Sequence, residues 1–170
     1  MIKKYAEFVK SLMATNESHD VENKTDDGKK VSGLKEVVEI IGLGKMKAKL
    51  DSGNTTNQCA LIVQKFEEKD GKVKFDFNGE EQEYEVVDHK KIWHHGESTE
   101  RPVIKVDIKF HDSIYKDELV NLKISDLTGT KHYRCRMLLS KQFMSRANVV
   151  VDPSKTFELT DKKDLKKDKK

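Results

Sequence analysis

Apolar and polar residues alternate along most of the chain after residue 33, with the period of two that is typical of half-buried β-strands. Residues 103–110 show the pattern best, because apolar residues there alternate with Lys105, Asp107 and Lys109. Other segments of alternating or continuous apolar residues are 36–41, 46–50, 60–66, 73–77, 84–87, 119–124, 137–139 and 149–151. Many short strands at regular spacing predict a small barrel or sandwich.

Two dipeptides predict where these strands turn. Asp70-Gly71 and Asn78-Gly79 are typical of tight β-hairpins, because both central residues of such a turn adopt positive φ angles. Residues 140–146 are the only helical candidate in the strand-rich region. The predicted fold class is therefore mainly β, with one short helix in this region.

The first 33 residues have a different pattern. Residues 1–14 carry apolar side chains at spacings of three and four, which predicts a short amphipathic helix. Residues 15–33 are predicted to form a polar linker, because they contain few aliphatic side chains to bury. The helix is interpreted either as a docking or sorting element or as a frayed helix that lies on its own domain.

The distribution of charged residues along the chain bears on which kinds of partner it could bind. The chain has 33 Lys and Arg against 30 Asp and Glu, and 37% of its residues are charged while 35% are hydrophobic. The net charge of +3 belongs to the last ten residues of a Lys-rich tail at residues 158–170, since these ten hold six Lys and three Asp. The other 160 residues are neutral in sum, whereas nucleic-acid binding needs a basic patch on the folded part. We therefore expect no nucleic-acid partner.

Other features favour a cytoplasmic protein. No run approaches the roughly 18 apolar residues of a membrane span, so no membrane partner is expected. Charged residues interrupt the first 13 positions, which is unlike a signal peptide. Cys59 and Cys135 make no disulfide framework, and their apolar surroundings predict that they are small core residues.

One short motif carries candidate chemistry. The apolar segment 46–50 ends on Asp51-Ser52-Gly53, a turn that can hold a carboxylate at a strand end while glycine allows close approach of the backbone. The tripeptide is also ordinary turn chemistry, so by itself it does not distinguish a catalytic aspartate from one that caps a turn.

Four segments in this order resemble the retropepsin-like family often labelled "ATP-dependent zinc protease", which includes the partner protein of RimK-type glutamate ligases. The resemblance covers about residues 34–157. The matching segments are 47–56 (KAKLDSGNTT), 101–104 (RPVI), 136–143 (RMLLSKQF) and 149–154 (VVVDPS).

The resemblance implies a small closed β-barrel of aspartic-protease type at residues 34–157. It implies that Asp51 is the catalytic residue. Its turn would consist of Ser52, Gly53, Asn54 and Thr55, and the supporting loop of Leu138, Leu139 and Ser140. A chain with one such aspartate needs a homodimer, in which two carboxylates share one proton. The ionised carboxylate activates water, and the protonated one polarises the carbonyl of a polypeptide substrate. No metal or other cofactor is required, and a RimK-type ligase is implied as a partner by the family alone.

Two positions and one segment, residues 125–132 (SDLTGTKH), depart from the family pattern. Ser140 replaces the glycine that follows Leu-Leu, and Asn54 replaces the alanine that follows the active-site turn. In addition, residues 1–10 resemble the short leader of many tailed-bacteriophage proteins, although an ordinary helix start explains them equally well. An alternative function is therefore a catalytically inactive binding module or a virion structural protein, located in the bacterial host cytoplasm or in the virion.

The histidines near residue 90 suggest two further hypotheses. No cysteine pair accompanies His89 and His94, so the spacing does not predict a zinc site. The segment 42–45 (GLGK) also lacks the pattern of a phosphate loop, so no ATP site is predicted.

Trp93, His94 and His95 are interpreted as a flap over the active-site cleft. In the alternatives, this segment is an exposed polar loop or Trp93 anchors it on the barrel.

Overall fold

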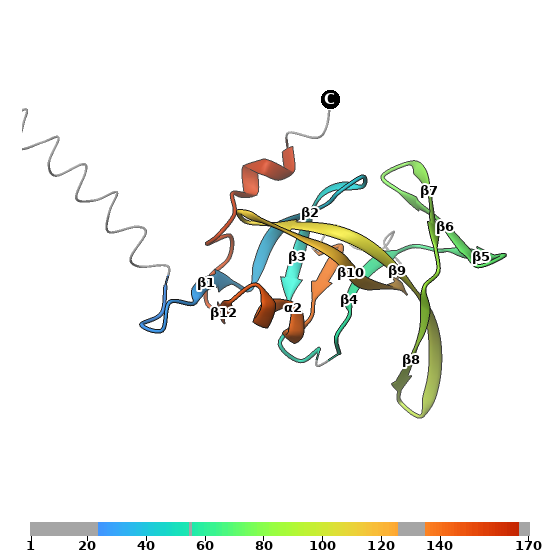
Figure 1. The fold of residues 1–170 in the computed structure, drawn as a ribbon, viewed down its shortest axis with the longest axis horizontal. Helices are drawn as coiled ribbons and strands as arrows, with labels where there is room; N and C mark the ends of the chain where they lie inside the picture. The colour runs from blue at the N-terminus through green and yellow to red at the C-terminus, as the bar shows by residue number, and fades with distance from the viewer. Residues whose placement is uncertain (1–23, 55, 126–134, 167–170) are drawn as a thin grey trace, which may run out of the picture.

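The computed structural model describes residues 24–54, 56–125 and 135–166. The predicted helix at residues 1–14 and Thr55 lie outside this range. Figure 1 shows the arrangement of the elements. They are β1 (Lys30–Gly33), β2 (Lys35–Ile40), β3 (Gly44–Leu50), β4 (Cys59–Val63), β5 (Glu67–Lys69), β6 (Lys72–Phe77), β7 (Glu80–Glu85), β8 (Asp88–His94), β9 (Glu97–Phe110), β10 (Ser113–Ile124), β11 (Met137–Leu139), α2 (Lys141–Arg146), β12 (Val149–Asp152) and the 3₁₀ helix η1 (Lys162–Lys166).

Six strands form a closed ring of hydrogen-bonded neighbours in the order β10, β4, β11, β3, β2 and β9, and pairing of β9 with β10 completes it. Strand β8 extends the sheet from β9. Strand β11 runs parallel to β3, and its first two residues also pair with β4, so this short strand joins two parts of the ring. The mainly β class predicted from the alternating pattern is confirmed.

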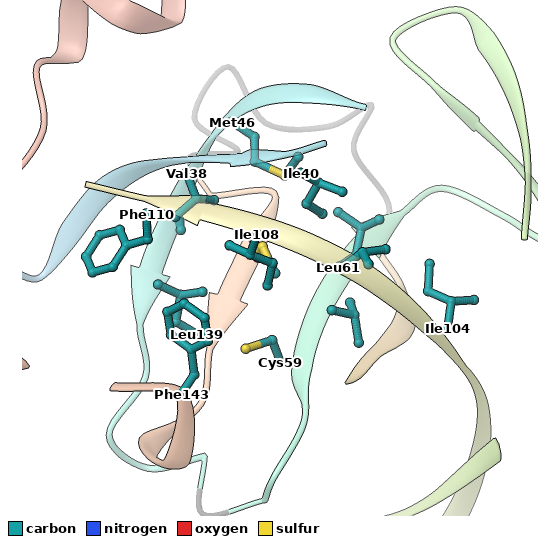
Figure 2. Packing of buried hydrophobic residues seen from close by; sticks show 14 of the residues in the cluster. Val38, Ile40, Met46, Cys59, Leu61, Ile104, Ile108, Phe110, Leu139 and Phe143 are labelled. Atoms are coloured by element: carbon teal, nitrogen blue, oxygen red, sulfur yellow. The ribbon is translucent and has the colours of Figure 1, made fainter. Parts of the chain in front are cut away.

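The hydrophobic core is built from buried side chains of the ring strands and α2 (Figure 2), and three residues of β6 join it. Phe143 of α2 enters it, with ring centroids 6.1 Å from Phe110 and 4.9 Å from Tyr115. A helix of six residues is too short to be stable alone, since isolated helices need about 12–15 residues. Burial of a phenylalanine contributes roughly 1.5–3 kcal/mol, so Phe143 fixes α2 on the core.

The two predicted hairpin turns are confirmed in a separate sheet of β5, β6 and β7. Their central residues have the positive φ angles that the turn type requires, 52° and 73° at Asp70 and Gly71 and 57° and 87° at Asn78 and Gly79. Strand β5 was not predicted, because all three of its residues are exposed and polar. The inner face of β6 is buried through Val73, Phe75 and Phe77.

Strand β1 lies inside the segment that we predicted as a polar linker at residues 15–33. It pairs in parallel with β12, with Val31 opposite Val150. Long-range pairing therefore orders a segment whose own composition offers little to bury. The backbone of Thr156 also packs on Gly33 so closely that a Cβ atom there would lie 2.6 Å from Thr156 Cα.

The start of the predicted Lys-rich tail is also attached to the ring. The carboxylate of Glu36 is fully buried and accepts hydrogen bonds from the backbone N–H groups of Glu158, Leu159 and Thr160. The folded body therefore extends at least to Thr160, beyond residue 157 where the resemblance ended. These partners of Glu36 could not be predicted from the sequence, because they lie more than 120 residues away along the chain.

Candidate active site

Asp51 lies directly after β3, where β3 runs beside β11. Leu50 is opposite Leu139 in the parallel register, and the Asp51 N–H donates to the Leu139 carbonyl oxygen at 3.0 Å. The Asn54 N–H donates to the Asp51 carbonyl oxygen at 3.0 Å and closes the turn. The structure thus brings the Asp51 turn and the supporting loop together, with Leu139 buried and Leu138 half-buried.

The carboxylate of Asp51 is accessible. Asp51 is half-buried, whereas Ser52 and Gly53 are exposed. A Cβ atom built on Gly53 would lie 3.5 Å from Asp51 Oδ1, so the carboxylate lies over the glycine. Within the described residues this carboxylate has no hydrogen bond or ion pair. It is therefore available to a water molecule, a substrate or a second carboxylate.

Helix α2 begins against the same turn. The Lys141 N–H donates to the Asn54 carbonyl oxygen at 2.9 Å. Ser140, fully buried, is the N-cap of the helix, and its hydroxyl accepts from the Phe143 N–H at 3.2 Å. Ser140 thus uses its hydroxyl inside the fold, at the position where the resemblance implied glycine.

Cys59 lies under the turn, with its sulfur 4.0 Å from the Ser140 hydroxyl. Burial raises the pKa of the Cys59 thiol to about 11, and the hydrogen bonds to Ser140 offset only part of this effect. The thiol is therefore protonated at neutral pH and acts as an apolar core group, not as a nucleophile.

A groove begins at the turn and runs along α2 to β12. It was not predicted from the sequence, because its walls come from segments that are far apart along the chain. Its lining includes Lys29, Ser52, Lys141, Met144, Val150 and Val151. The lining of the groove thus combines apolar side chains with two cationic side chains.

The predicted flap is a β-hairpin formed by β8 and the first part of β9. In Figure 1 this hairpin extends to one side of the molecule, and β1 and β12 lie at the other. Trp93 is 69% exposed, with the Lys91 ammonium 5.2 Å from its ring centroid, so it does not anchor the hairpin on the ring. His95 occupies the turn with a φ angle of 50°. The side chain of His94 lies outside the described residues, and the flap function stays a prediction.

The described residues also bear on metal binding and on membrane insertion. No three His, Cys, Asp or Glu side chains there come together in a way that could hold a metal ion. None of the helices there is long and apolar enough to span a membrane.

Comparison with known proteins places this geometry in context. A family model described as "RimB-like: Retropepsin-like aspartic endopeptidase RimB" matches residues 31–162. Among solved structures, Lpg0085 from Legionella pneumophila, a protein of unknown function, is 27% identical, with a TM-score of 0.55. The match covers 75% of this chain and 95% of that one. No curated protein matches the chain significantly.

Proposed function

Because this chain belongs to the RimB-like family of retropepsin-like aspartic endopeptidases, we propose that it hydrolyses peptide bonds as a homodimer that uses Asp51 from each subunit. The observation that carries the proposal is the placement of Asp51. Its carboxylate lies over Gly53 at the end of β3, while its backbone N–H is held by Leu139.

The proposed chemistry needs two carboxylates. At contact distance they do not both ionise, so the pair holds one proton. The ionised carboxylate removes a proton from water, which attacks the scissile carbonyl carbon, while the protonated carboxyl donates a hydrogen bond to the carbonyl oxygen. The resulting tetrahedral intermediate collapses as the amide nitrogen is protonated and the C–N bond breaks. One subunit supplies only half of this pair.

The first experiment is the substitution Asp51→Asn. An asparagine cannot act as a general base, so we expect cleavage of a fluorogenic peptide library by the purified protein to fall by at least about 100-fold. Asp70→Asn is the matched control, because Asp70 occupies a hairpin turn at a φ angle of 52° that asparagine also tolerates. Equal activity of Asp51→Asn and wild-type protein would refute the assignment.

A second experiment tests the dimer. In a mixture of wild-type and Asp51→Asn subunits at equal concentrations, random pairing leaves about a quarter of the dimers with two aspartates. Activity per wild-type subunit therefore falls to about half if both carboxylates are needed, and it is unchanged if one subunit suffices. Sedimentation at the assay concentration shows whether dimers form. A protein that neither cleaves peptides nor dimerises would instead fit the alternative, an inactive binding or virion structural module.

A further inference from the structure

The loop after the Asp51 turn is folded around the side chain of Asn54. Asn54 Nδ2 donates to the Gln58 carbonyl oxygen at 3.2 Å, and Asn54 Oδ1 accepts from the Thr56 N–H at 3.2 Å. The Thr56 hydroxyl lies 2.7 Å from Asn54 Oδ1 and 3.0 Å from the Gln58 carbonyl oxygen, so its one hydrogen can be donated to either. Both ends of the Asn54 amide are thus used inside the loop.

The backbone of Asn54 links this loop to two other elements. Its N–H closes the Asp51 turn, and its carbonyl oxygen accepts from Lys141, the first residue of α2. The side-chain bond to Gln58 holds the residue just before β4, and Gln58 is itself buried. Asn54 therefore joins the Asp51 turn, the start of α2 and the start of β4.

We propose that Asn54 is a positioning residue that fixes the Asp51 carboxylate relative to α2 and β4. The inference deepens the proposed function and rests on it for the catalytic consequence. A pair of carboxylates that shares one proton works only at contact distance, so each turn must be held rigidly before the two subunits meet. Displacement of a catalytic group by about 1 Å can cost about 100-fold in rate. Asn54 makes local bonds that an alanine at this position cannot make.

The test compares Asn54→Ala with Asn57→Ala, a matched substitution of an exposed asparagine in the same loop. For Asn54→Ala we expect kcat to fall about 10- to 100-fold while KM stays within about twofold. Thr56→Val is a milder second variant. It removes the Thr56 hydroxyl, which lies 2.7 Å from Asn54 Oδ1, and keeps the hydrogen bond from the Thr56 backbone N–H to Asn54 Oδ1. It should give an intermediate loss, and it keeps the test valid if Asn54→Ala folds poorly.

A second measurement does not depend on activity. Amide hydrogen exchange of Asp51 and Lys141 reports the two backbone bonds that hold the turn. We expect exchange at both positions to be about fivefold faster in Asn54→Ala than in Asn57→Ala, since loss of a hydrogen bond weakens local stability by about 1 kcal/mol.

The outcomes separate the two hypotheses. If wild-type protein cleaves peptides and Asn54→Ala matches Asn57→Ala in kcat, the positioning role is refuted and the proposed function stands. If wild-type protein does not cleave peptides, the proposed function fails. Amide hydrogen exchange then decides whether Asn54 holds the Asp51 turn. Faster exchange at Asp51 and Lys141 then supports the role of Asn54 in holding the turn, and unchanged exchange overturns it.

Discussion

Replacement of Glu36 by glutamine should destabilise the protein strongly, because the buried carboxylate holds the C-terminal segment on β2. One oxygen, Oε1, accepts from the backbone N–H groups of Gly33 and Glu158, both at 2.9 Å, and of Leu159 at 3.2 Å, and from the Ser32 hydroxyl. The other, Oε2, accepts from the Thr160 N–H at 3.0 Å and hydroxyl at 2.5 Å.

The magnitude follows from these partners. A hydrogen bond to a charged group contributes about 1.5–3 kcal/mol, and an unsatisfied buried donor costs about 1–3 kcal/mol. In Glu36→Gln the oxygen can serve only one of the two groups of donors. If the amide NH₂ faces Thr160, the N–H of that residue loses its acceptor, and the remaining bonds lose the negative charge. We expect the free energy of unfolding to fall by about 3–5 kcal/mol, a large part of the roughly 5–15 kcal/mol typical of a domain.

Urea denaturation followed by circular dichroism measures this change. Glu39→Gln is the matched control, because Glu39 lies on the same strand and its carboxylate has no hydrogen bond or ion pair within the described residues. We expect that control to change stability by less than about 0.5 kcal/mol. A Glu36→Gln protein as stable as the control would refute the view that this carboxylate holds residues 158–160.

Two further predictions concern residues under the Asp51 turn. Because the Cys59 pKa is raised from 9.0 to about 11, the protonated thiol favours the folded state, and this contribution is lost as pH rises between those values. Stability from urea denaturation should therefore fall more between pH 9 and 11 for wild-type protein than for Cys59→Ala, and parallel curves would contradict the assigned cause. Ser140→Ala should lower stability by about 1 kcal/mol through loss of the N-cap, whereas Ser140→Gly should cost only a few tenths. Thermal unfolding of both variants checks this, and equal losses would argue against the cap.

The local parts of the fold could be predicted because their signals lie within a few residues. Alternation marks the strand at residues 103–110, and the hairpin dipeptides need positive φ angles that glycine and asparagine supply. Strands β1 and β5 gave no such signal. One is ordered by pairing with β12, more than 100 residues away, and the other consists of exposed polar residues.

The candidate site was predictable only in part for the same reason. The order of short motifs indicated Asp51, its turn and the supporting Leu138-Leu139 pair. The attachment of Lys141 to Asn54 and the groove lined by Lys29 and Val150 depend on contacts between distant segments. No pattern in neighbouring residues reports such contacts.

Two of the departures from the family pattern, Asn54 and Ser140, lie at one backbone contact, and this bears on whether the site is functional. Asn54 accepts the Lys141 N–H, and Ser140 caps the same helix one residue earlier. Each new side chain has hydrogen-bond partners, so neither displaces the turn: Leu139 still accepts from the Asp51 N–H, and Gly53 still leaves room for the carboxylate. The departures therefore do not argue against catalysis by themselves. Under the proposed mechanism, activity further requires a second subunit that brings its own Asp51 within contact distance.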